Sequence, residues 1–176
     1  MRIISGKYRG MVLSQFGGKE IRPTADRVKE SLFNILSGEI AGAAVLDLFC
    51  GSGNLGIECL SRGAARVHFN DISKDSIAVL RKNLARLKDE SFAVTVKDYA
   101  LCLSGAKGFD LVFIDPPYAA DFGVNSLKII AEGNTLSRGG IAVFERDRAF
   151  GGEIDGLEKY DERKYGKTYL TFFRKL

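Results

Sequence analysis

The chain is poor in the residues on which several common enzyme chemistries depend. Its 176 residues include one histidine, three cysteines and three prolines. The histidine, His68, lies inside an apolar segment typical of a strand, so no histidine-based triad can be assembled. Cys50, Cys59 and Cys102 are widely spaced and form no CxxC pair, which argues against a zinc site and against a disulfide framework. We therefore expect reduced, buried thiols, a cytoplasmic location and no bound metal.

Long apolar runs are also missing. No run reaches the length of a membrane span, and residues 1–10 carry charge but no apolar stretch, so we expect no signal peptide. The hydrophobic fraction of 45% and the charged fraction of 27% are ordinary for a globular protein. The length predicts one domain over residues 1–176, with residues 1–37 as an N-terminal hairpin and helix extension. We expect a monomer.

The positive charge is concentrated at the two ends of the sequence. The first 30 residues carry seven basic and three acidic side chains, and the last 14 carry five basic side chains and no acidic one. Basic ends around a neutral to acidic middle favour a polyanionic partner held at the periphery. Ordinary solvated surface charge would produce the same composition, so this alternative stays open.

The hydrophobic pattern predicts an α/β fold. A short hairpin with a basic, aromatic tip is expected over residues 2–14, and a helix capped by Thr24 is expected to run to Gly38. Strand and helix patterns then alternate, which predicts a mostly parallel sheet with helices on both faces and a ligand site at the carboxyl ends of its strands. The expected strands are 44–49, 66–69, 92–96, 109–114, 140–144 and an antiparallel 169–173, and the expected helices of this part are 55–62, 73–87 and 124–131.

The tetrapeptide Asp115-Pro116-Pro117-Tyr118 follows the strand over residues 109–114. Two prolines make a stiff turn without N–H donors, so a backbone carbonyl can point outward and accept a hydrogen bond. The Asp115 carboxylate and the Pro116 carbonyl would then form two acceptors that face one amino group. Tyr118 supplies a flat surface for a planar base. This set indicates methylation of an exocyclic amine on a nucleobase, with these residues as its catalytic site.

A glycine-rich segment follows the first predicted strand and indicates a ligand site. Gly51 and Gly53 allow a tight turn that brings backbone N–H groups close to a ligand at a helix N-terminus. The pattern G-x-G-x-x-G also occurs in nicotinamide sites, but there an adjacent carboxylate such as Asp47 would repel the pyrophosphate. Beside a cationic amino acid and sulfonium the same carboxylate is favourable. Asp47, Phe49, Gly51 and Gly53 are therefore expected to bind S-adenosylmethionine.

Acidic residues also follow the next two predicted strands. Asp71 can accept from both hydroxyls of a ribose, and the neighbouring Ile72 can pack on an adenine. Asp98 is placed to accept from the adenine amino group. Each acid by itself could only cap a helix or be solvated in a loop. Together with the glycine segment and the tetrapeptide, they form a specific pattern for a methyl donor site.

With these motifs the chain resembles the RsmD-type 16S rRNA guanine-N2 methyltransferases of bacteria. The stretches that carry the resemblance are residues 2–10, 22–34, 47–63 and 115–118. The resemblance implies a class I methyltransferase (Rossmann-like) fold with a seven-stranded, mostly parallel sheet. It also implies S-adenosylmethionine as donor, and 16S rRNA within the small ribosomal subunit or its assembly intermediate as partner. Thr24 is placed near the donor on this ground alone, and the RNA-binding candidates are Lys7, Tyr8, Arg9, Arg22, Lys164 and Lys167.

Several alternatives share parts of this pattern. A DNA amino-methyltransferase uses the same chemistry but normally needs a target-recognition region, for which this chain has no room. A protein-glutamine methyltransferase fits the tetrapeptide but not the basic ends. A nicotinamide oxidoreductase would leave the tetrapeptide without a role. A non-catalytic RNA-binding protein of ribosome assembly could keep the fold, although the acids at Asp98 and Asp115 favour an enzyme.

Overall fold

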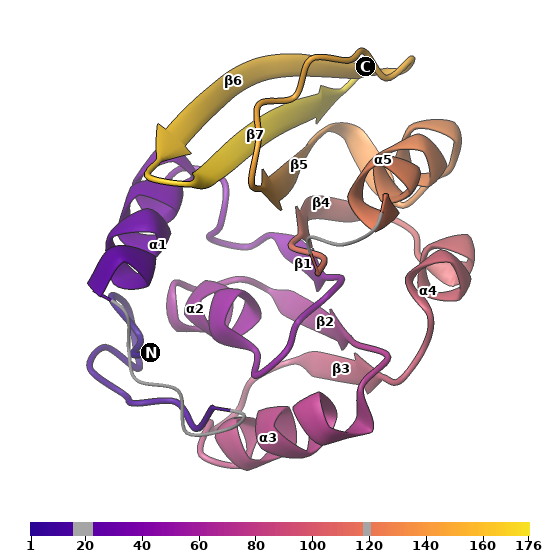
Figure 1. The fold of residues 1–176 in the computed structure, drawn as a ribbon. Helices are drawn as coiled ribbons and strands as arrows, with labels where there is room; N and C mark the ends of the chain where they lie inside the picture. Colours follow the sequence, from indigo (N-terminus) through magenta and orange to yellow (C-terminus); the bar gives the residue numbers. More distant parts are fainter. Residues whose placement is uncertain (16–22, 118–120) are drawn as a thin grey trace.

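The computed structural model describes residues 1–15, 23–117 and 121–176 (Figure 1). In these parts the strands form one seven-stranded sheet of order β3-β2-β1-β4-β5-β7-β6. Strands β1 to β5 are parallel, β7 is antiparallel to β5, and β6 is antiparallel to β7. This confirms the expected class I methyltransferase sheet. The strands are β1 (Ala44–Asp47), β2 (Arg66–Asn70), β3 (Phe92–Thr95), β4 (Phe109–Ile114), β5 (Leu136–Arg146), β6 (Leu157–Tyr165) and β7 (Thr168–Lys175).

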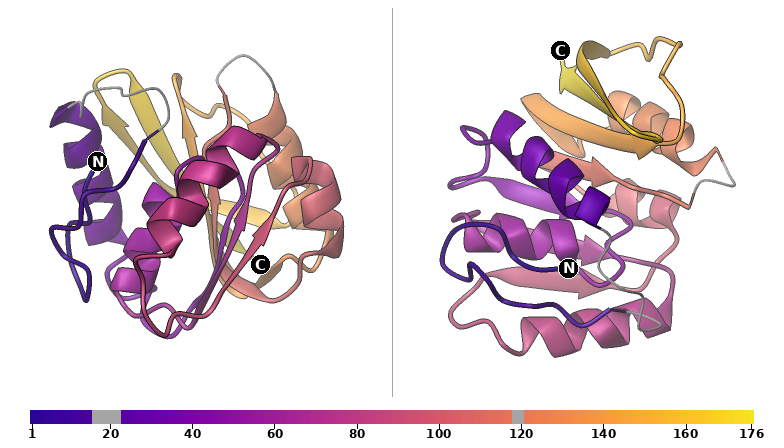
Figure 2. Two further views of the ribbon diagram at one scale, coloured as in Figure 1. Left: turned by 90° about the horizontal axis from the view of Figure 1, so that it is seen from below. Right: turned by 60° about the vertical axis from the view of Figure 1, so that its left-hand side comes forward.

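The helices cover both faces of the sheet, as Figure 2 shows from two sides. Helices α1 (Pro23–Ile35), α2 (Asn54–Ser61) and α3 (Lys74–Leu84) bury apolar residues on one face, and α4 (Tyr99–Gly105) and α5 (Phe122–Glu132) do so on the other. The period-two alternation along each strand sends successive side chains to opposite faces. None of the described helices is long and apolar enough to span a membrane.

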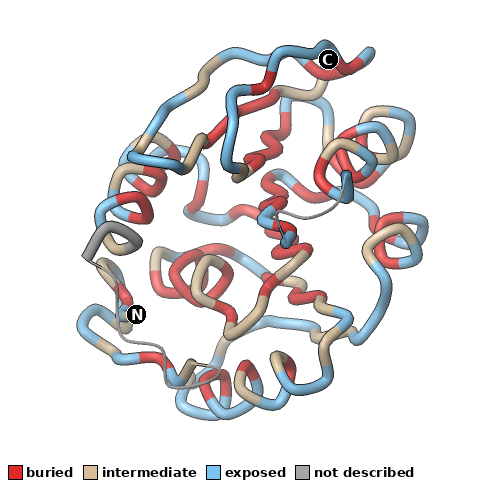
Figure 3. The backbone as a smooth tube through the Cα atoms, viewed as in Figure 1, coloured by how far each residue is buried: buried red, intermediate tan, exposed pale blue. Residues whose placement is uncertain are grey.

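Burial is concentrated in the central strands (Figure 3). In β4, Leu111 and Phe113 pack with α1 to α3, whereas Val112 and Ile114 pack with α4 and α5. All four of these side chains are at most 1% exposed. A strand buried on both faces reads as a continuous apolar run, and this is why the sequence pattern identified it.

The N-terminal extension folds back on itself as expected, but it is less regular than a β-hairpin. Arg2 and Val12 form a single antiparallel bridge, with further backbone hydrogen bonds such as Ile3 N–H to Met11 O at 2.9 Å. The following helix begins at Pro23 rather than after a Thr24 cap. Proline is favourable at the first helical position because it has no N–H to leave unpaired there. A Thr24 cap would start the helix at residue 25, so the predicted start is wrong by two residues.

Two elements were not expected from the sequence. Helix α4 has only seven residues, too few for a clear helical period. Strand β6 is an edge strand whose described side chains are mostly exposed or half-buried on both faces. Its sequence is rich in charged residues, and charge on an edge strand discourages pairing with other chains. The apolar alternation that reveals an inner strand is for that reason missing from β6.

Candidate active site

Four aspartates stand where parallel strands end. Asp47 ends β1, Asp71 follows β2, Asp98 is the N-cap of α4 beyond β3, and Asp115 follows β4. Because the carboxyl ends of parallel strands meet at one edge of the sheet, all four residues line cavities at this edge. The sequence predicted this arrangement, and the structure brings the four side chains together.

The glycine segment between β1 and α2 adopts a backbone that favours glycine. Gly51 and Gly53 have φ angles of 53° and 85°, and a Cβ atom on Gly53 would lie 2.3 Å from Leu80 Cδ1. The N–H of Gly51 donates to Asp71 Oδ2 at 2.9 Å, and Asp71 Oδ1 accepts from Ser73 N–H at 2.8 Å. Asp71 therefore ties the segment to the start of α3. Each of its oxygens keeps a second lone pair for a ligand.

The first cavity, of about 500 Å³, lies over the ends of β2 and β3. Its walls are largely aromatic and aliphatic: the ring centroid of Tyr99 lies 5.8 Å from that of Phe49 and 5.2 Å from that of Phe122. Ile72, also in the wall, is 69% exposed. Asp71 and Asp98 supply carboxylates at its rim. Apolar walls with a few polar groups suit a planar base attached to a sugar.

The second cavity, of about 650 Å³, lies beside the first. Phe49 and Asp115 line both cavities, so a ligand in two parts can extend from one to the other past these residues. Three carboxylates face the second cavity, those of Asp47, Asp115 and Glu145. Its other walls come from Met1, α1, the glycine segment and the turn between β6 and β7.

Burial changes the acidity of two of these carboxyl groups. Loss of solvation raises the pKa of Asp47 to about 7, and the negative charge of Asp71 adds to this rise. A hydrogen bond from Gly56 N–H acts in the opposite direction and lowers the pKa. Asp115 is accessible to water from the cavity, yet protein surrounds it on its other sides. This desolvation, followed by the charges of Glu145 and Asp47, raises the pKa of Asp115 well above its usual value. A cationic ligand would relieve this crowding of negative charge.

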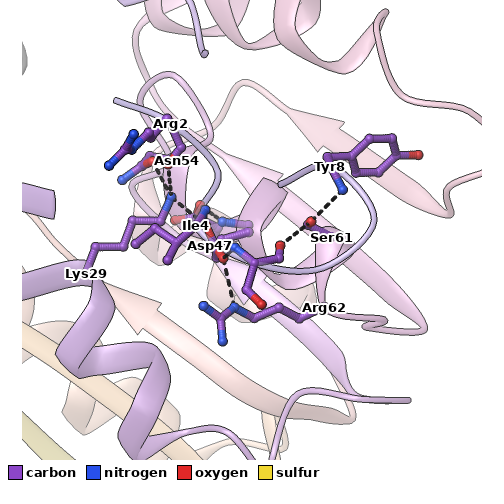
Figure 4. Close-up of polar contacts among 11 residues, drawn as sticks. Arg2, Ile4, Tyr8, Lys29, Asp47, Asn54, Ser61 and Arg62 are labelled. Atoms are coloured by element: carbon purple, nitrogen blue, oxygen red, sulfur yellow. Dashed lines mark hydrogen bonds and ion pairs between the residues drawn. The ribbon is translucent and has the colours of Figure 1, made fainter. Parts of the chain in front are cut away.

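A buried ion-pair cluster holds the N-terminal extension against the second cavity (Figure 4). Glu58 of α2 is fully buried and accepts from Lys29 Nζ at 2.8 Å and from Arg62 Nε at 2.8 Å. The same carboxylate accepts from the N–H groups of Ile4 and Ser5 at 2.8 and 3.0 Å. Glu58 thus joins α1, α2 and the N-terminal segment. Met1 and Lys29 form part of the cavity wall as a result.

The hairpin tip lies away from the cavities. Lys7 N–H donates to the carbonyl of Ser61, the last residue of α2, and Tyr8 Oη donates to Glu90 at 2.7 Å in the loop that leads into β3. Lys7 Nζ pairs with Glu90 at 2.9 Å, and Arg9 is exposed. The tip therefore sits at the sheet edge opposite the strand ends that carry the aspartates. Its RNA-binding role remains a prediction.

The remaining predicted residues lie in different places. Lys167 lines the second cavity at the turn between β6 and β7, while Lys164 lies over the Tyr169 ring at 5.3 Å. Pro116 is in the wall of the first cavity. Tyr118 and Arg22 lie outside the described residues, and Thr24 is within α1 without a described side chain. Burial raises the pKa of the Cys50 thiol, which leaves it without the character of a nucleophile.

Sequence reasoning missed several residues of the second cavity. Glu145 stands at the end of a predicted strand, as the four aspartates do, so the same argument could have found it. Tyr165 and Lys29 carried no such signal, because only the packing of β6 and α1 brings them to the cavity. Arg146 and Arg148 lie beside Pro116 and Pro117 in a smaller pocket, whose walls also include Asp121, Glu145 and Asp147.

Sheet order, glycine segment and strand-end acids together define a class I methyltransferase. Two solved structures with 30% sequence identity to this chain support the class. The Escherichia coli protein yhhF, assigned as a methyltransferase, is 30% identical with a TM-score of 0.89 and covers 99% of this chain and 97% of its own. The Haemophilus influenzae protein HI0767, assigned as a methylase, is 30% identical with a TM-score of 0.83 and covers 99% and 98%.

Sequence comparison identifies the family. The family model described as Conserved hypothetical protein 95 matches residues 1–174, and the chain belongs to this family. The ribosomal RNA small subunit methyltransferase D of Haemophilus influenzae is 37% identical over 153 residues, 84% of this chain and 79% of the relative. The E. coli protein of the same name is 37% identical over 139 residues, 78% and 70%. The resemblance to RsmD-type methyltransferases is thereby confirmed, and membership of this methyltransferase family supports the predicted cofactor, S-adenosylmethionine.

The raised pKa of Asp47 leads to a prediction about stability. In the unfolded chain this carboxyl ionises near pH 4, so between about pH 4 and 7 the native state binds more protons than the unfolded state. Wild-type stability should therefore fall as pH rises through this window. Asp47→Asn, which keeps an acceptor for Gly56 N–H, should remove the share of this fall that Asp47 carries and gain roughly 3 kcal/mol over wild type between pH 5 and pH 8. Urea unfolding at both pH values measures it.

The matched control is Asp155→Asn, because Asp155 is exposed to solvent. This variant should follow the wild-type pH dependence. If Asp47→Asn shows the wild-type pH dependence of stability as well, the pKa of Asp47 is not raised in the native state.

Proposed function

We propose that this chain transfers a methyl group from S-adenosylmethionine to the exocyclic N2 amine of a guanine in small-subunit (16S) rRNA. The observation that carries the proposal is that Asp115 lines both cavities, with Pro116 beside it in the wall of the first. The first cavity has the walls of a nucleoside site, and the second would take the amino-acid end of the donor together with a second substrate. The relatives named ribosomal RNA small subunit methyltransferase D support rRNA as that substrate.

The residues present fit the donor. Phe49, Ile72 and Tyr99 offer apolar surfaces to its adenine, Asp98 an acceptor for the adenine amine, and Asp71 acceptors for the ribose hydroxyls. Asp47 and the glycine segment would hold the amino-acid end, where a carboxylate favours a cation. S-adenosylmethionine supplies an electrophilic methyl group carried on a sulfonium. Thr24 is proposed near the amino-acid end on the family resemblance.

Asp115 and Pro116 would orient the target amine. The lone pair of a guanine N2 amine is delocalised into the ring, which makes the nitrogen a poor nucleophile. If the Asp115 carboxylate and the Pro116 carbonyl each accept one N–H, the nitrogen can pyramidalise and its lone pair points out of the ring plane. Holding this geometry lowers the barrier to methyl transfer more than proton removal does, because it keeps the amine nitrogen aligned with the methyl group at near-attack distance. Tyr118 would stack on the base, which must leave its helical stack to reach the cavity.

Methyl transfer to small ribosomal subunits that lack the modification tests the proposal. Labelled S-adenosylmethionine is supplied, and the rRNA is digested to nucleosides. Labelled N2-methylguanosine supports donor, substrate class and target atom together. Parallel reactions contain DNA or protein in place of subunits, and label in N6-methyladenine of DNA, or in a protein glutamine, would replace the proposal by the corresponding alternative. Donor binding without transfer to any of these substrates would favour a non-catalytic assembly protein.

Two basic regions are proposed to hold rRNA phosphates. One is the hairpin tip with Lys7, Tyr8 and Arg9, and Arg22 is a further candidate from the sequence. The other, which we name the mouth, comprises Arg148 beside Pro116 and Pro117, and Lys167 in the second cavity. Lys164 is a weaker candidate. The mouth lies at the site itself, whereas the tip would need RNA that extends to the opposite edge of the sheet.

Salt dependence separates the two regions. Each lost phosphate contact should reduce the slope of log affinity against log salt by about 0.7 to 0.9. We expect Arg148→Ala with Lys167→Ala to reduce this slope by about 1.5 in binding to small subunits. Lys7→Ala with Arg9→Ala is the matched pair. If the Lys7 and Arg9 substitutions leave affinity and slope unchanged, the predicted role of the hairpin tip is wrong. If the Arg148 and Lys167 substitutions leave both unchanged, the mouth does not contact RNA.

A further inference from the structure

Glu145 is a third carboxylate beside the transfer site, and strand register places it next to Asp115. Strands β4 and β5 are parallel neighbours in which Ile114 is paired with Phe144. Asp115 and Glu145 are the residues that follow this pair. Ile114 and Phe144 pack with α4 and α5, so the alternation of side chains directs the next residues to the opposite face, toward α1 and α2. Both Asp115 and Glu145 line the second cavity there.

The charges of the two groups interact. The negative charge of Glu145 is the largest electrostatic contribution, after desolvation, to the raised pKa of Asp115. Glu145 is half-buried and lies between the second cavity and the pocket that contains Pro116 and Pro117. A base that offers its amine to Asp115 can turn N1, one of the two ring positions beside that amine, toward Glu145.

Guanine and adenine differ at this adjacent position. Next to its N2 amine, guanine carries N1–H, which is a donor. Next to its N6 amine, adenine carries N1 with a lone pair, which is an acceptor. An ionised carboxylate has only acceptors, so it binds N1–H and repels the lone pair. Enzymes that act on a flipped base commonly read its Watson–Crick edge in this way.

We propose that Glu145 accepts a hydrogen bond from N1–H of the target guanine while Asp115 holds the N2 amine, so that Glu145 selects guanine. This assignment rests on the proposed function, because it takes a nucleobase amine as the methyl acceptor. Glu145 then sets specificity, and Asp115 and Pro116 orient the reacting nitrogen. Without such a residue, Asp115 and the Pro116 carbonyl could hold the amine of either purine.

Substitution of one base tests the assignment. After the target guanine has been located, small subunits are reconstituted with rRNA that carries guanine or 2-aminopurine at that position. 2-aminopurine keeps the N2 amine but has a lone pair at N1, and it lacks O6. We expect wild type to prefer guanine by about 100-fold in kcat/KM, as for the loss of a hydrogen bond to a charged group. In Glu145→Gln the side-chain amide can donate to N1 of 2-aminopurine, so the preference should fall to about 10-fold or less.

The comparison of the two ratios isolates the contact to N1, because loss of O6 affects both enzymes alike. Glu158→Gln, at an exposed position of β6, is the control and should keep the wild-type ratio. Glu145→Asp retains a carboxylate and should keep the preference at a lower rate, which covers the case of an unfolded glutamine variant. An unchanged ratio in Glu145→Gln, with donor binding intact, overturns the assignment of Glu145 alone. Absence of N2-methylguanosine from wild type on guanine subunits overturns the proposed function as well.

Discussion

Asp115→Ala should lower the rate of methyl transfer by roughly 10³-fold while donor affinity changes only a few-fold. The side chain lies where the two cavities adjoin, and its removal takes away one of the two acceptors proposed for the target amine. Single-turnover transfer to unmodified small subunits measures the rate, and calorimetric titration with S-adenosylmethionine measures donor binding. A variant with near-wild-type turnover would refute the role of Asp115.

Asp115→Asn separates orientation from proton removal. Asparagine retains one acceptor oxygen but cannot take up a proton, so a small loss would point to orientation as the main contribution. Because the pKa of Asp115 is raised, the wild-type rate should increase with pH as the carboxyl ionises and then level off. The asparagine variant should lack this step. Asp121→Asn is the control, since Asp121 is exposed and lines only the neighbouring small pocket.

Glu58→Ala should lower the stability of the fold more than any other substitution proposed above. The carboxylate is fully buried and pairs with Lys29, whose side chain is 3% exposed. Removing Glu58 leaves a buried ammonium without its counter-charge, at a cost of about 3–5 kcal/mol. It also removes the acceptor of the Ile4 and Ser5 N–H groups, which fixes the N-terminal segment. Urea unfolding measures the stability, and limited proteolysis reports the release of residues 1–13.

A double substitution is the informative control for this cluster. Glu58→Gln with Lys29→Met removes the two most deeply buried charges of the cluster. It should regain most of the stability, because the remaining charge, on Arg62, has a side chain that is 16% exposed. If the double variant is as unstable as Glu58→Ala, the loss comes from packing rather than from the ion pair. In wild type, burial opposes ionisation of Glu58, but Lys29, the Ile4 N–H and Arg62 outweigh it and lower its pKa. This contribution to stability is present above the unfolded carboxyl pKa and is lost as pH falls through the folded value.

Most strands and the donor side of the site could be predicted from the sequence because their signals are local. Strands β1 and β4 each contain a continuous apolar run, residues 44–46 and 111–114. Ser73 caps α3 by accepting from Ser76 N–H at 3.2 Å, and the glycine segment follows β1 directly. The aspartates follow their strands along the chain. Parallel pairing then brings them to one edge without further information.

Tertiary structure alone decided which distant groups meet. Glu145 reaches Asp115 only through the pairing of β4 with β5, and Lys29 reaches Glu58 only because α1 packs on α2. The position of the hairpin tip depends likewise on two long-range hydrogen bonds. Lys7 bonds to Ser61, 54 residues further along the chain, and Tyr8 bonds to Glu90, 82 residues further along. Local sequence determined the identity and the strand-end position of the chemical groups, since backbone propensity and turn chemistry act over a few residues. Packing of the helices on the sheet decided which of those groups share a cavity, since it depends on the whole buried surface.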